Sequence, residues 1–267
     1  MNVVLQIEHL SKKFGSFTAV SDISLAVSAG EIFGFLGPNG AGKTTTIKML
    51  AGLLLPSAGT VSICGHDLAR SPLAGKRLTG YIPDRPYLYE KLTGDEYLRF
   101  IASLYREGDP EPVIAEAGRF LELFDLSDWR HHLIEGYSHG MRQKLIMTSI
   151  FMLGQPLIVV DEPMVGLDPK SARIVKELFK SLAARGTAVF LSTHSMEIAE
   201  ELCDRIAIIQ HGRLTSTGSI DELRAQAASG RKNLEDIFLE LTGAYELQGI
   251  IRALRQDAGR PAGEVDR

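Results

Sequence analysis

The sequence has little cysteine, no long basic tract and no apolar run of membrane length, and each absence excludes a class of protein. Its two cysteines, Cys64 and Cys203, lie far apart without metal-ligand spacing, so neither a disulfide framework nor a zinc site is expected. They predict small buried thiols in a reducing compartment. The most membrane-like stretch, residues 145–160, is interrupted at Gln155 and Pro156 and is shorter than the roughly 20 residues that a spanning helix needs.

Positive charge is not in excess either. Lys and Arg total 29 against 33 Asp and Glu, which gives a formal net charge of −4. Because nucleic-acid binding rests largely on clustered Lys and Arg, we expect no nucleic acid among the partners. Ser and two Lys at residues 11–13 interrupt the first apolar run, which argues against a signal peptide. The 267 residues, 45% hydrophobic, predict one large α/β domain or one domain with a small lobe.

A glycine-rich stretch is the strongest motif. It fits G-x-x-x-x-G-K-[ST] with Gly37, Gly42, Lys43 and Thr44 at the fixed positions. The apolar residues before it suit a buried strand and those after it have helical spacing, which argues against an ordinary glycine-rich turn. Backbone N–H groups and the helix N-terminus would surround the phosphates of a nucleotide, Lys43 would reach the terminal ones, and the Thr44 hydroxyl would ligate Mg²⁺. The residues expected to bind the nucleotide are Gly37, Pro38, Asn39, Gly40, Ala41, Gly42, Lys43, Thr44 and Thr45.

Two acidic residues follow a second apolar strand. Residues 157–160 are Leu, Ile, Val and Val, and Asp161 and Glu162 come directly after them. Ligands of doubly wound sheets bind at the carboxyl ends of the strands. Asp161 therefore suits a contact with Mg²⁺, and Glu162 suits accepting a proton from an attacking water. A buried strand with a solvated acidic turn is the alternative, and the phosphate loop upstream favours the catalytic interpretation.

The periodicity of the chain predicts an α/β fold with an inserted helical lobe at about residues 84–153. Residues 3–26 alternate apolar and polar side chains, which is typical of antiparallel strands around a turn at Gly15. Beyond them, apolar runs alternate with helical patterns, which predicts a mainly parallel sheet with crossover helices. The strands expected after residue 26 are 31–36, 60–64, 78–82, 157–160, 188–192, 206–210 and 213–217. The expected helices are about 45–51, 92–105, 111–124, 138–153, 170–184, 196–203, 220–227 and 234–241.

Local signals set the expected limits of the elements and domains. Thr93 and Glu96 are three residues apart, which predicts a capping box at the first lobe helix. We expect a main domain at residues 1–228 and a short helical extension at residues 229–255. Residues 256–267 contain no apolar cluster, so we expect a disordered tail.

Together the motifs resemble the ATP-binding subunit of an ABC transporter. Residues 137–141, Tyr-Ser-His-Gly-Met, lie where this family has its signature sequence, usually Leu-Ser-Gly-Gly-Gln, and Arg-Gln follows, as is typical. Three of the five positions differ, but Ser138 and Gly140 are kept. Ser138 suits the N-cap of a helix whose N–H groups could hold a γ-phosphate, and a plain capped helix is the alternative. The signature residues implied to contact a partner's ATP are Ser138, His139, Gly140 and Met141.

Further family motifs follow in order between residues 3 and 225. Gly-Leu-Asp-Pro at residues 166–169 resembles the D-loop, with Asp168 in it. His194 resembles the switch histidine that would contact the γ-phosphate, and Phe14 aligns with the aromatic residue that stacks on adenine. A core position is the alternative for Phe14. Asp84 departs from the family, which usually has a Q-loop glutamine there; an aspartate can bind Mg²⁺ but has a shorter reach and a charge.

The resemblance implies a P-loop NTPase core with a mainly parallel sheet, an N-terminal antiparallel β subdomain and an inserted α-helical lobe. It implies ATP and Mg²⁺ as ligands, with Thr44, Asp161 and Asp84 at the metal and Glu162 and His194 in catalysis. Each ATP would lie between the phosphate loop of one subunit and the signature of a second, either a copy or a paralogue.

It also implies a partner, because ATP hydrolysis in this family drives a separate membrane permease. Residues 85–93, with Tyr87, Leu88 and Tyr89, are the expected docking surface, although these side chains could equally belong to the lobe core. Residues 137–143 and 234–243 are most similar to exporter subunits for drugs, sodium or polysaccharide. We therefore expect a peripheral exporter subunit at the cytoplasmic face of the plasma membrane. A soluble ABC-type ATPase and a regulatory nucleotide-binding module are the alternatives.

Overall fold

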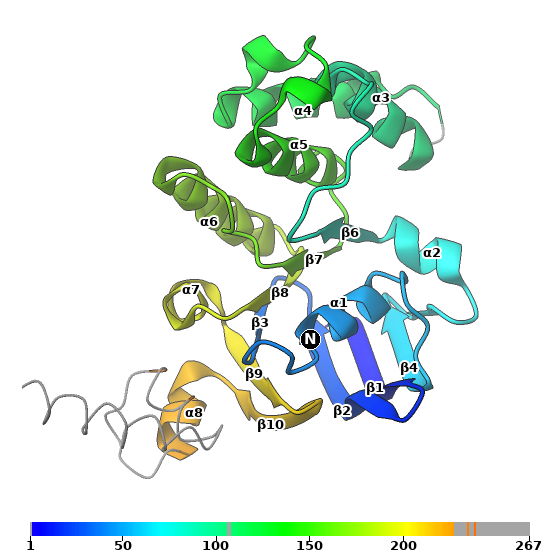
Figure 1. The fold of residues 1–267 in the computed structure, drawn as a ribbon, viewed down its shortest axis with the longest axis vertical. Helices are drawn as coiled ribbons and strands as arrows, with labels where there is room; N and C mark the ends of the chain where they lie inside the picture. The colour runs from blue at the N-terminus through cyan, green and yellow to red at the C-terminus, as the bar shows by residue number, and fades with distance from the viewer. Residues whose placement is uncertain (1, 106–107, 227–233, 235–237, 239–267) are drawn as a thin grey trace, which may run out of the picture.

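Two β-sheets and a helical lobe make up the computed structural model, which describes residues 2–105, 108–226, 234 and 238 (Figure 1). A four-stranded antiparallel sheet has the order β2-β1-β4-β5. A six-stranded sheet has the order β10-β9-β3-β8-β7-β6, in which only β10 is antiparallel to its neighbour. The strands are β1 (Val3–Phe14), β2 (Phe17–Ser28), β3 (Ile32–Leu36), β4 (Ala58–Ile63), β5 (His66–Asp67), β6 (Thr79–Ile82), β7 (Leu157–Asp161), β8 (Ala188–Thr193), β9 (Arg205–Gln210) and β10 (Arg213–Gly218).

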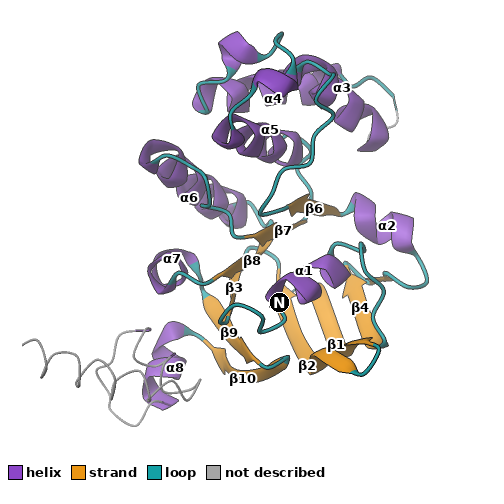
Figure 2. Ribbon diagram, viewed as in Figure 1, coloured by secondary structure: helices purple, strands orange, loops and turns teal. Residues whose placement is uncertain are grey.

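Helices cover both faces of the larger sheet (Figure 2). The α-helices are α1 (Lys43–Leu50), α2 (Pro72–Arg77), α3 (Gly94–Tyr105), α4 (Glu111–Leu123), α5 (His139–Phe151), α6 (Pro169–Ala184), α7 (Met196–Leu202) and α8 (Ile220–Gln226). Two short 3₁₀ turns, Ser127–Trp129 and Ile134–Gly136, lie between α4 and α5. The parallel sheet, the antiparallel subdomain and the inserted lobe of α3, α4 and α5 confirm the predicted fold class.

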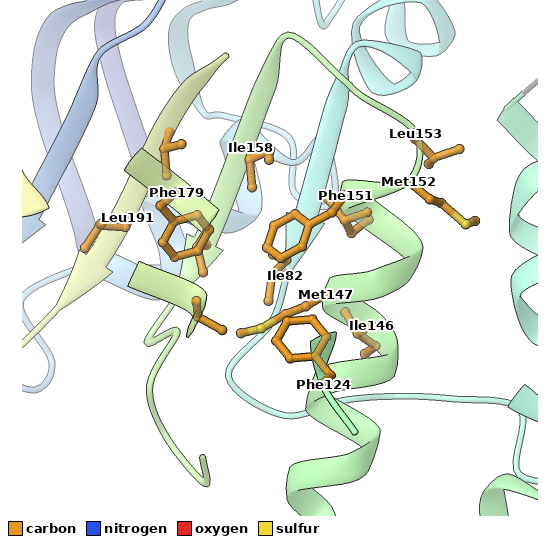
Figure 3. Packing of buried hydrophobic residues seen from close by; sticks show 14 of the residues in the cluster. Ile82, Phe124, Ile146, Met147, Phe151, Met152, Leu153, Ile158, Phe179 and Leu191 are labelled. Carbon is orange, nitrogen blue, oxygen red and sulfur yellow. The ribbon is translucent and has the colours of Figure 1, made fainter. Parts of the chain in front are cut away.

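Alternate residues of the central strand β8 enter two separate hydrophobic cores. Phe190 stacks on Phe33 with ring centroids 5.7 Å apart, in the core between the two sheets. Val189 and Leu191 point to the opposite face, toward α5 and α6. Because both faces of the strand are buried, its first four residues, 188–191, are all apolar, as expected for a central parallel strand, and the polar Ser192 and Thr193 follow at its carboxyl end. The second core joins the lobe to the sheet, and Figure 3 shows Phe151 of α5 beside Phe179 of α6.

The predicted helix caps are present. The Thr93 hydroxyl accepts the N–H of Glu96 at 3.2 Å, and a Glu96 carboxylate oxygen accepts the N–H of Thr93 at 2.8 Å. This reciprocal pair confirms the capping box at the start of α3. Ser138 caps α5 by accepting the N–H of Met141 at 3.3 Å, which also agrees with the sequence.

The remaining predictions concern membrane-spanning helices and the C-terminal residues. In the part of the chain that the structure describes, no helix combines the length and the apolar character needed to cross a membrane. The helix expected at residues 234–241 and the tail at residues 256–267 lie outside the described residues, apart from Leu234 and Phe238. Leu234 is buried, and its N–H donates to a carboxylate oxygen of Glu200 at 2.9 Å, near α7.

Candidate functional site

The phosphate loop connects β3 to α1 at the carboxyl edge of the parallel sheet. Gly42 lies directly before Lys43, the first residue of α1, with a φ of 110°. A Cβ atom added to Gly42 would lie 2.6 Å from the carbonyl oxygen of Ala19, so the loop can approach β2 this closely only with glycine there. The N-terminus of α1 is thereby fixed beside the loop, with its free N–H groups available to a phosphate.

Lys43 supplies the positive charge of the loop. Its ammonium donates to the carbonyl oxygens of Gly37 at 2.6 Å and Pro38 at 3.2 Å. Burial lowers the pKa of Lys43, and the negative charges of Glu162 and Asp161 act in the opposite direction. A bound phosphate would give the ammonium an anionic acceptor in place of the two carbonyl oxygens.

The predicted acidic residues lie at the end of β7, next to β8. Asp161 is 2% exposed and pairs with Ser192 across the two parallel strands, and the Ser192 hydroxyl donates to one of its carboxylate oxygens. Its other oxygen, Oδ2, is buried without a hydrogen-bond partner among the described residues. An unpaired buried carboxylate oxygen is costly, so this atom is suited to a cation.

Glu162 and His194 are brought together by the neighbouring strands. Oε1 of Glu162 lies 2.8 Å from Nδ1 of His194, within hydrogen-bond distance. The Glu162 N–H donates to the carbonyl oxygen of Ser192 at 3.2 Å, and Glu162 has a φ of 50°. A non-glycine residue in this left-handed region is strained and often belongs to a functional site. Glu162 lines the same cavity as the phosphate loop.

A cavity of about 400 Å³ brings together residues of the phosphate loop, Asp84, Asp161 and Glu162, whereas His194 is absent from its described lining. The loop, the two acidic residues and Asp84 all face it, so segments from three parts of the chain meet there. Phe17 also lines it, whereas Phe14 is absent from the described lining. The lining residues are Phe17, Ala19, Asn39, Gly40, Gly42, Lys43, Thr44, Thr45, Asp84, Asp161 and Glu162.

The aromatic residue beside the cavity was therefore missed by the sequence reasoning. Phe14 and Phe17 pair across the β1–β2 hairpin. The ring of Phe14 is half exposed and has the ammonium of Lys12 5.1 Å from its centroid, while Phe17 is 64% exposed and borders the nucleotide cavity. The sequence signal that could have identified it is Phe17 itself, a second aromatic residue three positions after Phe14.

The signature and the D-loop lie together, outside this cavity. The His139 ring packs over Gly166, where an added Cβ would lie 2.3 Å from the ring. Lys144 forms an ion pair with Asp168 at 3.3 Å, and Asp168 caps α6 by accepting the N–H of Ser171 at 2.9 Å. Hydrogen bonds from Ser171 hold the pKa of Asp168 well below its usual range. Ser138 and His139 are exposed, which leaves this end of α5 open to another molecule.

Comparison with known proteins finds relatives that match most of the chain. A family model described as "ABC transporter" matches residues 20–165. The chain is 34% identical to the daunorubicin resistance ATP-binding protein DrrA3 of Streptomyces coeruleorubidus, covering 99% of this chain and 92% of that protein. It is 36% identical to the probable multidrug ABC transporter ATP-binding protein YbhF of Escherichia coli (strain K12), over 89% of this chain but only 41% of YbhF.

A solved structure has nearly the same architecture. It is described as the structure of an ATP binding subunit of an ABC transporter, is 35% identical, and superposes with a TM-score of 0.86 over 90% of this chain and 99% of that one. With the phosphate loop, the two acidic residues and the inserted lobe arranged as described, the chain belongs to the ABC transporter family, as one of its ATP-binding members.

Proposed function

We propose that this chain binds and hydrolyses ATP and thereby drives a separate membrane permease, as an exporter subunit. The observation that carries the proposal is that Glu162 lines the cavity formed by the phosphate loop and lies within hydrogen-bond distance of His194. A carboxylate and an imidazole at this position can respectively accept a proton from water and contact a γ-phosphate. The names of the relatives, daunorubicin resistance for DrrA3 and multidrug for YbhF, support an exporter rather than an importer.

The chemistry assigned to the chain is mainly positioning and charge. The loop N–H groups and Lys43 hold the phosphates, and Glu162 takes the proton of the attacking water. His194 shares a hydrogen bond with that carboxylate, which fixes the direction in which Glu162 points. His194 can also contact the γ-phosphate, so one side chain would link the phosphate to the base.

The same residues fit a magnesium ion. The unpaired Oδ2 of Asp161 and the oxygens of Thr44 and Asp84 are hard ligands of the kind Mg²⁺ prefers. Among the described residues no three His, Cys, Asp or Glu side chains converge to hold a metal alone, so phosphate oxygens would supply further ligands. When bound, the ion neutralises negative charge on the phosphates.

A second subunit is part of the proposal because the chain has one phosphate loop and one signature. The exposed Ser138 and the N-terminus of α5 would contact the ATP held by the other subunit's loop. The D-loop next to the signature would lie in the same interface. A copy of this chain or a paralogue would complete the site.

The lobe carries the surface proposed for the permease. Tyr87 is 89% exposed and Tyr89 is 61% exposed, whereas Leu88 packs against the core. A groove of about 570 Å³ between lobe and sheet is lined by Tyr87 and reaches Thr44 and Asp84, which also line the nucleotide cavity. Exposed aromatic side chains beside an apolar groove suit a protein partner. Such a partner would place the chain at the cytoplasmic face of the plasma membrane.

Substitution of the proposed base tests the proposal. Glu162→Gln should bind ATP, remain dimeric in its presence and lose nearly all turnover, since the amide cannot accept the proton. The measurements are phosphate release and sedimentation with and without ATP, and Glu177→Gln on α6 is the control for a lost carboxylate far from the cavity. Hydrolysis by Glu162→Gln at the wild-type rate would exclude Glu162 as the base. A regulatory module, the alternative, predicts no hydrolysis by the unchanged chain.

A further inference from the structure

Residues 83–92, which we call the docking strap, connect β6 to the lobe and include most of the proposed permease surface. The strap runs from the sheet past α5 into the lobe (Figure 1). Its middle is exposed at Tyr87 and Tyr89, whereas each end is hydrogen-bonded to a residue that directly follows the signature. The strap therefore carries most of the proposed permease surface and also contacts the residues that follow the signature.

Gln143 holds the end of the strap nearest the ATP site. Its side-chain amide donates to the carbonyl oxygen of Pro83 at 3.1 Å, one residue before Asp84. Gln143 is fully buried, and its Oε1 has no hydrogen-bond partner among the described residues. Leaving a buried acceptor unpaired costs about 1–3 kcal/mol. A shift of the strap that supplied a donor to this oxygen would be favoured, so this contact is suited to two arrangements.

Arg142 holds the other end. Its Nη1 lies 2.6 Å from a carboxylate oxygen of Glu90, in the strap. Its Nε donates to the carbonyl oxygen of Tyr137 and its Nη2 to that of Glu135, each at 3.1 Å. One guanidinium thus joins the strap to the two carbonyl groups that lead into Ser138. A backbone hydrogen bond connects the same two segments, because the N–H of Glu135 donates to the carbonyl oxygen of Glu90 at 3.0 Å.

Open space separates Arg85 and Pro86 of the strap from the start of α5. A cavity of about 280 Å³ lies there, lined by Arg85, Pro86, Tyr137, His139 and Arg142. Arg85 and Pro86 can therefore move toward or away from the signature, whereas Leu88 and Leu92 stay packed against the core. Because the two ends are hydrogen-bonded to Arg142 and Gln143, a movement of the strap would be transmitted to the signature.

We infer that Arg142 and Gln143 are positioning residues that join the docking strap to the signature, so that a partner bound at the strap shifts residues 138–141 against the second subunit's ATP. This inference rests on the proposed function. Coupling between two binding events is reciprocal, so formation of the ATP dimer must affect the strap as much as docking affects the dimer. The coupling can therefore be measured without the permease.

The test uses Glu162→Gln protein with ATP, which holds the dimer. Sedimentation gives the dimer dissociation constant, and hydrogen exchange reports the strap amides, including that of Leu92, which donates to Tyr89. ATP should slow strap exchange in the Glu162→Gln parent. Adding Glu90→Gln should weaken the dimer roughly three- to tenfold and reduce the ATP effect on exchange. In an Arg142→Met background, Glu90→Gln should change neither value further.

Glu116→Gln is the matched control, because its carboxylate accepts from Arg119 within α4 and makes no contact with the strap. It should leave both values at those of the parent. Glu90 is half exposed, so Glu90→Gln should fold even if Arg142→Met does not, and thermal unfolding checks this. Unchanged dimerisation and unchanged strap exchange in Glu90→Gln would overturn the inference. A Glu162→Gln parent that fails to dimerise with ATP would instead overturn the proposed function.

Discussion

At the scale of single residues, two phenylalanines are candidates for the adenine contact. Phe17 lines the nucleotide cavity, and Phe14 lies beneath the ammonium of Lys12, which is two residues before it in β1. Family resemblance favours Phe14, whereas the geometry favours Phe17. A ring can hold adenine only by presenting a free face, and the ammonium of Lys12 lies over one face of Phe14.

Separate alanine substitutions distinguish the two rings. We expect Phe17→Ala to weaken ATP binding by about 1–3 kcal/mol, the usual value of one aromatic stacking contact with a base. Phe14→Ala should have a smaller effect. Binding of a fluorescent ATP analogue, with inorganic triphosphate as a ligand that lacks the base, measures the difference. If Phe14→Ala causes the larger loss for ATP and neither change affects triphosphate, the adenine contact belongs to Phe14.

At the scale of elements, the turn that contains the proposed D-loop joins the proposed base to the proposed signature. It begins at Glu162, whose carbonyl oxygen accepts the N–H of Val165 at 3.2 Å, and it ends at the cap of α6. Gly166, in this turn, has a φ of 79° and lies beneath the His139 ring of the signature. The proposed base and the proposed signature are therefore separated by only a few packed residues.

Gly166→Ala should disturb this junction specifically. The added methyl would strain the backbone and displace His139, so we expect weaker ATP-dependent dimerisation with little change in ATP binding by the monomer. Sedimentation of the variant in a Glu162→Gln background gives the dimer constant. Gly118→Ala in α4 is the control, because its Cβ would enter open space and should stabilise the helix by about 0.5–1 kcal/mol. Equal dimer constants for both variants would argue against a role for the junction.

Helices and strands with a strong apolar periodicity could be predicted from the sequence. Short helices, and contacts between residues far apart in the chain, could not. The central strands and lobe helices follow directly from apolar patterns that tertiary packing reinforces. Helix α2 was missed because its six residues include Pro72 and Gly75, which read as a turn. The meeting of Glu162 and His194 depends on β7 lying beside β8, and a sequence gives the order of strands along the chain but not their order in the sheet.

At the scale of the whole molecule, a nucleotide bound in the cavity would contact the loop, both sheets and the strap. The cavity takes residues from β2, the loop, the strap and the end of β7. A ligand bound there stabilises the folded chain by RT ln(1 + [L]/Kd), about 2.7 kcal/mol when ATP is at 100 times its dissociation constant. For a protein of this size that corresponds to an increase of roughly 5–10 °C in melting temperature.

Lys43→Ala should abolish this ATP-dependent increase. Lys43 is buried in the loop, and its ammonium is the cation placed to meet the terminal phosphates. Lys48→Ala is the matched control, since Lys48 lies in the same helix, is exposed and lines the neighbouring groove instead. The comparison is the shift that ATP and Mg²⁺ cause within each variant, measured by thermal unfolding, because removing a buried lysine also alters the ATP-free protein. A full shift in Lys43→Ala would exclude the loop as the ATP site, whereas loss in both variants would indicate a general effect of charge.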